Sequence, residues 1–300
     1  MTARHLLVIA HTGRNDALVA AGQVCDQLRS AGLTPVLAPL QSEILASHVD
    51  GDFVTLGKDV SLAELELIIV LGGDGTILGA AELTRGSPAP LLGVNLGHVG
   101  FLAESERDDL PWTVQRALAR EYEVEDRLVL DVVVLEAGKE IFRTFAINEA
   151  TIEKASRARM IEVALEIDSR PISTFGADGV VMATPTGSTA YSFSAGGPVV
   201  WPGVEALLMV PLSAHALFAR PLVVGPDSVM AVELLERSSA SAVLWCDGRR
   251  GIDLTPGSRV EARRSSEPVR LARLHAGPFT DRLVNKFSLP VTGWRGPGKE

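Results

Sequence analysis

A glycine-rich turn around Asp74 holds the residue types and spacing in this chain that are best suited to chemistry. Residues 67–71 are apolar and partly β-branched, which is typical of a strand buried on both faces of a parallel sheet. Residues 72–76 follow as Gly-Gly-Asp-Gly-Thr, and a helical pattern begins at once. A lone carboxylate in a glycine cradle at the carboxyl end of a strand can accept a hydroxyl proton or hold a metal beside a phosphate. A tight turn in which Asp74 caps the helix is the structural alternative.

Two further polar segments could contact a ligand. Residues 184–192 combine hydroxyl side chains with glycine and proline, so they could surround a polar ligand, and Tyr191 offers a ring face for a base or a nicotinamide. Asn148 and Glu149 are expected at a strand end, where Asn can pair with an adenine edge and Glu can accept from a ribose diol. A helix cap and a plain turn are the respective structural alternatives. Arg159 adds positive charge nearby in sequence, with a solvated strand edge as the alternative.

Other nucleotide-binding and hydrolytic signatures do not fit the chain. Gly73 and Gly75 could begin a dinucleotide fingerprint, but its third glycine position falls on Leu78. Neither the P-loop sequence Gly-x-x-x-x-Gly-Lys-Ser/Thr nor the nucleophile elbow Gly-x-Ser-x-Gly occurs. A phosphate would therefore be bound in a different manner from those folds.

Composition and charge narrow the classes of function. A length of 300 residues with 46% hydrophobic content suits one large or two ordinary domains. The formal charge of −9 argues against a nucleic-acid binder. Cys25 and Cys246 make neither a metal-ligand spacing nor a disulfide framework, which suits a cytoplasmic protein. Residues 207–225 are apolar, but Pro211 and Arg220 interrupt them, so we expect soluble core and no membrane span.

The first 125 residues alternate strands with helices, which predicts a parallel sheet covered by helices in a Rossmann-like α/β domain over residues 1–125. Leu18, Ala21, Cys25 and Leu28, for example, are spaced to share one helix face. The expected strands are 6–10, 34–38, 67–71 and 91–94. The expected helices include the one that carries these four residues and ends near Gly32, and one at 110–120.

The pattern changes after residue 125 to short strands at close spacing with few helices. This predicts a β-sandwich-like domain over residues 126–275, so the fold class is α/β plus all-β, and ligands commonly bind where two domains meet. A tail of residues 276–300 is expected to carry a helix at 279–286 and to pack back on the first domain. Asp247 with Gly248 is interpreted first as a turn. The expected strands are 128–135, 140–147, 160–167, 172–175, 180–183, 229–235, 242–245 and 259–262.

Taken together, these residues resemble the NAD kinase family, in particular its actinobacterial-type members, over nearly the whole chain. The Gly-Gly-Asp-Gly-Thr motif alone is weak, because lipid kinases and phosphofructokinases share it, whereas the ordered set of motifs is specific. The matching segments are 72–76, 93–97, 148–149, 178–179, 184–192, 195–198 and 286–294.

The resemblance implies phosphorylation of the adenosine ribose 2′-hydroxyl of NAD to give NADP, with ATP as donor, polyphosphate as the alternative donor and a divalent metal, Mg²⁺. It implies that Asp74 accepts the hydroxyl proton, that Asn148 and Glu149 contact adenine and ribose, and that Asp178 binds the nicotinamide end. Family members are homo-oligomers, so a homodimer or homotetramer is expected. The ligand-binding residues expected on this basis, with no metal ligands assigned, are Gly72, Gly73, Gly75, Thr76, Asn95, Asn148, Glu149, Arg159, Asp178, Thr186, Ser188, Thr189, Ala190, Tyr191, Ser192 and Ser194.

This chain departs from several relatives in having Gly79 and His98 where they have arginine, and those arginines are suited to phosphate contacts. Two other functions compete with the kinase of NAD: a lipid or sugar kinase of the same superfamily, and a sensor that binds NAD(H) without turnover. The hydroxyl-rich segment and the Asn148–Glu149 pair favour a nucleotide over a lipid acceptor. Asp74 favours catalysis over sensing.

Overall fold

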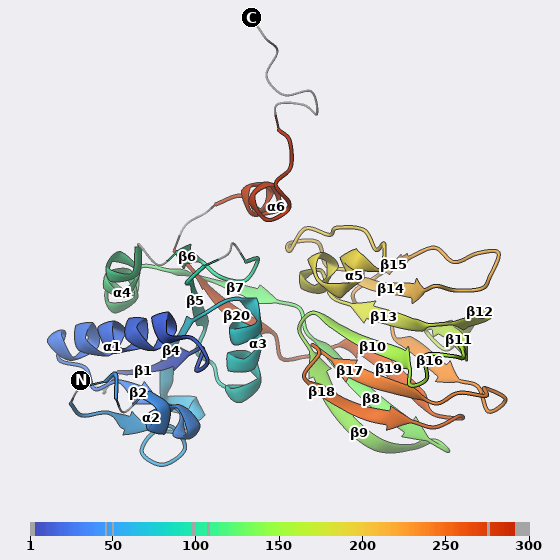
Figure 1. Cartoon of the computed structure of the whole chain (residues 1–300), viewed down its shortest axis with the longest axis horizontal. Helices are drawn as coiled ribbons and strands as arrows, with labels where there is room; N and C mark the ends of the chain where they lie inside the picture. The colour runs from blue at the N-terminus through green and yellow to red at the C-terminus, as the bar shows by residue number, and fades with distance from the viewer. Residues whose placement is uncertain are drawn as a thin grey trace, which may run out of the picture. The chain divides into compact units, whose positions relative to one another are not determined.

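The computed structural model describes residues 4–45, 47–49, 51–97, 100–106, 109–274 and 277–291. The chain forms two compact units, which are coloured along the sequence in Figure 1. Unit 1 contains the residues up to Asp126 together with those from Val269 onward, and unit 2 is Arg127–Pro268. Unit 1 is an α/β unit and unit 2 is built from β-strands, so the predicted fold class is confirmed.

Unit 1 is built on a sheet whose strands run in the order β3-β2-β1-β4-β5-β20-β7, with β6 paired to β5. The strands β1 to β6 pair in parallel, as the alternation of strands and helices predicts. The strands are β1 (His5–Ala10), β2 (Val36–Leu37), β3 (Val54–Thr55), β4 (Leu65–Leu71), β5 (Leu91–Asn95), β6 (Ser105–Glu106), β7 (Glu123–Arg127) and β20 (Val269–Arg273), and the α-helices are α1 (Asn15–Ser30), α2 (Pro39–Leu45), α3 (Asp74–Leu83), α4 (Leu110–Ala119) and α6 (Phe279–Phe287).

Strand β4 lies in the middle of this sheet and carries the Asp74 turn at its carboxyl end. All five residues 67–71 are fully buried, so the prediction of a strand covered on both faces is confirmed. Helix α1 packs against β1, β4 and α4. Its buried face includes the predicted Leu18, Ala21, Cys25 and Leu28.

Strand β20 differs from the sequence expectation, which placed residues up to 275 in the second domain. β20 pairs in parallel with β5 through Leu271 and Leu91, so the chain returns to unit 1 at Val269. The physical reason is pairing with a strand far away in the sequence, because the alternating pattern of Val269–Arg273 by itself is equally typical of an antiparallel strand.

Unit 2 consists of two six-stranded antiparallel sheets, in the orders β15-β14-β13-β10-β17-β18 and β12-β11-β16-β19-β8-β9. Two short helices follow β13: the 3₁₀-helix η3 (Thr186–Thr189) and α5 (Tyr191–Ser194). The strands are β8 (Leu130–Glu136), β9 (Lys139–Ala146), β10 (Glu149–Lys154), β11 (Ile161–Ile167), β12 (Arg170–Ala177), β13 (Gly179–Ala183), β14 (Leu207–Leu212), β15 (Leu222–Val224), β16 (Met230–Leu234), β17 (Ala242–Cys246), β18 (Arg250–Leu254) and β19 (Arg259–Arg264).

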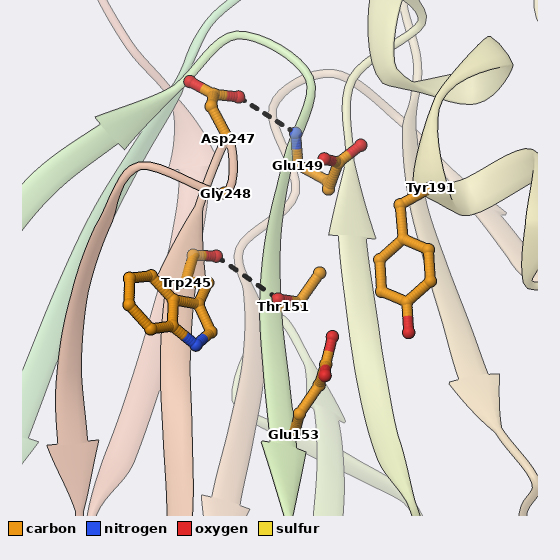
Figure 2. Close-up of a pocket in the computed structure, with 7 residues that line it drawn as sticks. All are labelled: Glu149, Thr151, Glu153, Tyr191, Trp245, Asp247 and Gly248. Carbon is orange, nitrogen blue, oxygen red and sulfur yellow. Dashed lines mark hydrogen bonds between the residues drawn. The ribbon is translucent and has the colours of Figure 1, made fainter.

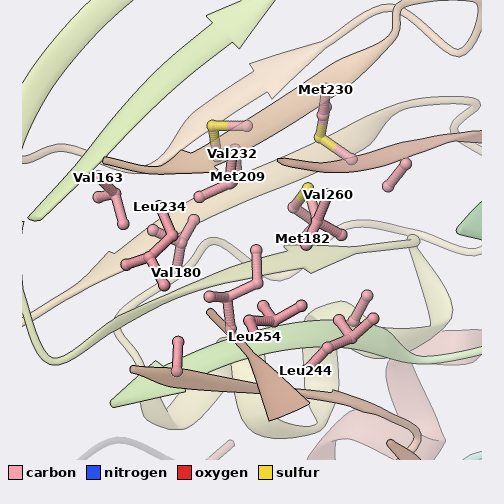
Figure 3. Close-up of a cluster of buried hydrophobic side chains, with 14 of the residues drawn as sticks. Val163, Val180, Met182, Met209, Met230, Val232, Leu234, Leu244, Leu254 and Val260 are labelled. Carbon is pink, nitrogen blue, oxygen red and sulfur yellow. The ribbon is translucent and has the colours of Figure 1, made fainter. Parts of the chain in front are cut away.

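The core of unit 2 lies between its two sheets, as expected for a sandwich. Figure 3 shows side chains of both sheets meeting there. The first sheet contributes Val180, Met182, Met209, Leu244 and Leu254, and the second contributes Val163, Met230, Val232, Leu234 and Val260.

Strand β13 is buried on both faces and thereby places the hydroxyl-rich segment that follows it. Val180 and Met182 face the core between the sheets, whereas Val181 and Ala183 pack with Val200 in a second cluster. The apolar segment 207–225 forms the antiparallel pair β14 and β15. Among the described residues, no helix has the length and apolar content needed to cross a membrane.

Candidate active site

Asp74 is the first residue of α3, with Gly73 in the capping position. Its carboxylate accepts two backbone hydrogen bonds, from the N–H of Phe101 at 3.0 Å and from the N–H of Leu102 at 3.1 Å. Each oxygen takes one of the two bonds, so the carboxylate is held in one orientation. Each oxygen also keeps a lone pair for a further donor or a cation.

The glycines around Asp74 differ in what they allow. Gly72 has φ = 155°, and a Cβ there would lie 2.4 Å from Oγ1 of Thr76, so the fold itself requires glycine. Gly100 faces the carboxylate, and a Cβ on it would lie 2.3 Å from Oδ1 of Asp74. Around Gly73 and Gly75, in contrast, the described residues leave open space. The two glycines that flank Asp74 therefore leave its backbone accessible to a ligand.

Asn95, another expected ligand-binding residue, ends β5 and is buried. Its Oδ1 accepts from the N–H of Gly97 at 3.3 Å. It lines a cavity of about 180 Å³ in unit 1 together with Gly100, Glu104 and Arg282 of α6. His98 lies outside the described residues.

A second cavity, of about 410 Å³, opens on unit 2 along strand β10. Because side chains alternate along a strand, the residues at positions 149, 151 and 153 share one face, while Ala150 and Ile152 point into the core. Figure 2 shows the rings of Tyr191 and Trp245 on opposite sides of this row. The lining residues are Glu149, Thr151, Glu153, Tyr191, Trp245, Asp247 and Gly248.

The Asn148–Glu149 corner is held by Asp247. This carboxylate accepts from the backbone N–H groups of Ile147 at 3.0 Å and of Asn148 at 2.7 Å, and it pairs with Arg250 at 2.8 Å. Its side chain is 1% exposed. The sequence placed Asn148 and Glu149 together at a strand end, whereas the structure starts β10 at Glu149 immediately after the corner. Asp247, interpreted from the sequence first as a turn residue, fixes that corner from the position directly after β17.

Glu149 is the most perturbed acid of this cavity. Burial, with a smaller contribution from the negative charge of Asp247, raises the pKa of Glu149 to about 7, although the backbone N–H of Tyr191 acts in the opposite direction. Its Oε2 is buried and has no hydrogen-bond partner among the residues that the structure describes. A buried carboxyl oxygen without a partner costs stability, which suits a group that gains its partner from a ligand.

The hydroxyl-rich segment uses part of its side chains for its own fold. Thr184 donates through Oγ1 to the carbonyl of Ile147 at 2.6 Å, and Ser188 donates to the carbonyl of Pro185 at 2.7 Å. Gly187 approaches the corner so closely that a Cβ would lie 2.0 Å from the carbonyl oxygen of Asn148. These contacts lock the segment against the corner that carries Glu149.

The remaining expected residues divide by their environment. Thr186 is buried with Ser188 in η3, and Thr189 donates through Oγ1 to the carbonyl of Thr186 at 3.2 Å. Asp178 pairs with Lys154 at 2.5 Å, and this hydrogen bond lowers the pKa of Asp178. Arg159, between β10 and β11, and Ser194 are exposed, and Ala190 is half-buried. Ser192 is buried, and its Oγ has no partner among the described residues.

Of the expected unit 2 residues, the structure brings Glu149 and Tyr191 into the cavity and leaves Asp178 and Arg159 outside its lining. Thr151, Glu153 and Trp245 also line the cavity but are not among the residues expected from the sequence. The usable signal was the alternation in residues 149–153, which read Glu-Ala-Thr-Ile-Glu and predict a strand with one polar face.

The residues near Asp74 fit a cation that is carried in by phosphates. No group of three or more His, Cys, Asp or Glu side chains in the described part of the chain forms a metal cluster. Mg²⁺ bound through substrate phosphates takes only one or two protein carboxylates, and the free lone pairs of Asp74 meet that need.

Known proteins are similar to this chain in sequence and in fold. The models of the ATP-NAD kinase N-terminal and C-terminal domains match residues 6–122 and 147–274. The chain is 66% identical to a protein named NAD kinase from Leifsonia xyli subsp. xyli, over 98% of this chain and 97% of that one. Its fold is similar to yeast NADH kinase complexed with NADH (TM-score 0.87, 21% identity, covering 96% and 88% of the two chains). It is also similar to an Archaeoglobus fulgidus NAD kinase in complex with ATP (TM-score 0.69, 24% identity, covering 95% and 97%).

Two family models therefore cover most of this chain in order, and a relative shares two thirds of its residues along nearly its full length. The Gly-Gly-Asp-Gly-Thr turn, the Asn-Glu corner and the hydroxyl-rich segment all lie within the matched ranges. The chain belongs to the NAD kinase family.

Proposed function

We propose that this chain is an NAD kinase that transfers the γ-phosphoryl group of ATP to the 2′-hydroxyl on the adenosine ribose of NAD, forming NADP and ADP. The observation that carries the proposal is the carboxylate of Asp74, held by two backbone N–H groups at the start of α3. The chain's membership of the NAD kinase family, and its similarity to a relative named NAD kinase, support the reaction. The ATP in the similar Archaeoglobus structure supports the donor.

Asp74 acts as the general base in this proposal. A carboxylate of fixed orientation can hold the 2′-hydroxyl and accept its proton while the oxygen forms its bond to the γ-phosphorus and the bond from that phosphorus to the β-phosphate oxygen breaks. The open space at Gly73 and Gly75 lets the substrate approach the backbone next to this group. Mg²⁺, when bound, would neutralise phosphate charge in a chain whose own net charge is negative.

The cavity on unit 2 is assigned to the adenosine part of NAD. Glu149 has a buried oxygen that has no partner in the described part of the chain and can accept from a ribose hydroxyl. The rings of Tyr191 and Trp245 offer faces for a base, and both are partly exposed. Asn148 at the corner is assigned to adenine, and Asp178 to the nicotinamide end, as the family resemblance implies.

A coupled assay tests the reaction and the base together. Purified chain is incubated with NAD and Mg-ATP, and NADP is read with an NADP-specific dehydrogenase. Asp74→Asn is expected to retain NAD binding by calorimetry and to lower kcat by a factor of about 10² or more. A kcat within about threefold of wild type would contradict the assignment of the base.

The matched control is Asp59→Asn, because Asp59 also accepts a backbone N–H, that of Thr55 at 2.8 Å, but lies in the turn after β3. Its kcat is expected within about twofold of wild type. NAD binding without any NADP from the wild type would favour the sensor.

Two further assignments belong to the same proposal. ATP is the preferred donor, and equal turnover with polyphosphate in the same assay would refute this preference.

The chain acts as a homodimer or homotetramer, in which contacts between subunits would cover exposed apolar side chains such as Leu217 and Phe218. A monomer mass by light scattering at assay concentration would refute it.

A further inference from the structure

The loop of residues 100–105 holds Asp74 on one side and is itself held on the other. Its N–H groups at Phe101 and Leu102 donate to the carboxylate. Its carbonyl groups accept from two arginines that are remote in the sequence. Arg282 of α6 donates through Nη1 to the carbonyl of Phe101 at 3.2 Å and to that of Ala103 at 2.8 Å. Arg273 of β20 donates to the carbonyl of Leu102 at 3.1 Å.

Glu104 joins the two arginines. Its side chain is 1% exposed and accepts from Nη2 of Arg282 at 2.7 Å and from Nη1 of Arg273 at 3.0 Å. It also accepts from the backbone N–H of Leu274 at 3.0 Å. Charge-assisted bonds of this kind are stronger than neutral ones, and they are directional where Arg is the donor. The loop is therefore fixed to β20 and α6 by a buried carboxylate whose two oxygens both accept hydrogen bonds.

Helix α6 is a surface helix that meets the loop through ring contacts. None of its residues is buried, and Phe101 packs between two of its rings, Phe279 at 5.7 Å and Phe287 at 6.0 Å between centroids. Segments with few buried contacts open more easily than the core of a unit. Since Phe101 also donates to Asp74, release of α6 would remove one of the two arginine attachments of the backbone that orients the carboxylate and leave the one from Arg273.

We propose that α6 is a positioning element for Asp74, with Arg282 as its positioning residue, acting through the loop of residues 100–105. The inference rests on the proposed function for its effect on rate, but not for its effect on the loop. Arg282 holds the carbonyl of Phe101, which shares its peptide plane with the N–H of Leu102, so that this N–H points at the carboxylate. Without this arginine, Asp74 remains at the start of α3, but its carboxylate loses the fixed orientation in which it accepts the proton.

The test compares Arg282→Ala and Arg282→Lys with Arg116→Ala. Arg116 is a matched control because it binds a backbone carbonyl and a carboxylate of the same residue, Glu121, in unit 1 and does not touch the loop. Arg282→Ala is expected to lower kcat by about tenfold to 10²-fold while KM for NAD stays within about twofold. Arg282→Lys keeps the charge at Glu104 and should recover part of the rate. Arg116→Ala should leave kcat within about twofold of wild type.

Two readouts separate positioning from general destabilisation. In the Asp74→Asn background, Arg282→Ala should lower kcat by less than about twofold, because the group through which it acts is already gone. Amide hydrogen exchange at residues 100–105 should accelerate by about tenfold or more in Arg282→Ala and stay unchanged in Arg116→Ala. If Arg282→Ala does not fold, Arg282→Lys is judged by the same measurements.

The proposal is overturned if exchange at residues 100–105 is unchanged, if kcat is unchanged, or if the two substitutions act additively. Hydrogen exchange does not depend on NADP formation. A wild type that makes no NADP would therefore refute the proposed function, whereas unchanged exchange would refute the positioning role.

Discussion

Replacing Glu149 with Gln should make the stability of this chain less dependent on pH. The pKa of Glu149 is raised by burial from an ordinary value of 4.5 to about 7. Between these two pH values the folded state keeps a proton that the unfolded state has already released. The free energy of unfolding therefore falls as the pH rises through this window. The loss of this stability is complete above about pH 7.

The magnitude follows from the same two values. The pKa of Glu149 differs by about 2.5 units between the folded and unfolded states, and each unit is worth about 1.4 kcal/mol, so about 3.5 kcal/mol of stability is lost between about pH 4.5 and pH 7. Glu149 is 7% exposed, so solvent does not screen the effect strongly. Gln carries no charge at any of these pH values and cannot show the loss.

The assay is urea unfolding of the wild type and of Glu149→Gln at several pH values from about 5 to 8. The free energy of unfolding of the variant, minus that of the wild type, should rise with pH by about 3 kcal/mol at most. Thr151→Val is the control, because Thr151 lies on the same wall of the cavity and does not titrate. Its difference from wild type should not change with pH.

A difference for Glu149→Gln that changes by less than about 1 kcal/mol over this range would contradict a raised pKa of Glu149 in the folded state. It would mean that the carboxyl is solvated or finds a partner in solution, and that its burial does not govern its ionisation.

Two further predictions concern the residues that hold the corner and the base. Asp247→Asn should lower the free energy of unfolding by about 1–3 kcal/mol, because an amide cannot accept from Ile147 and Asn148 and also pair with an arginine; unchanged urea unfolding would contradict this. Gly100→Ala should lower kcat by about tenfold or more at unchanged NAD affinity, because its Cβ would displace the Asp74 carboxylate. A wild-type rate in the coupled assay would show that the loop moves away without consequence.

The parts of the fold that follow from local pattern could be predicted from the sequence. The apolar run 67–71 and the motif after it specify a buried strand and a turn, and both are found as expected. Strand β20 could not be placed in this way, because its sheet is decided by a partner about 180 residues away. The hold of Arg282 on the Asp74 loop is invisible for the same reason, since it joins residues that are 179 and 181 positions apart.

The cavity on unit 2 shows the same limit in a sharper form. Its wall depends on the register between β10 and β17, in which Thr151 lies opposite Trp245 and Ala150 opposite Cys246. A slip by one residue would turn Glu149, Thr151 and Glu153 into the core and bring Ala150 and Ile152 to the surface. The burial of Ala150, Ile152 and Leu244 opposes that slip, and Asp247, next after β17, is then positioned to bind the backbone before Glu149. The local sequence identifies the polar face of β10, but the apolar face determines what that polar face meets.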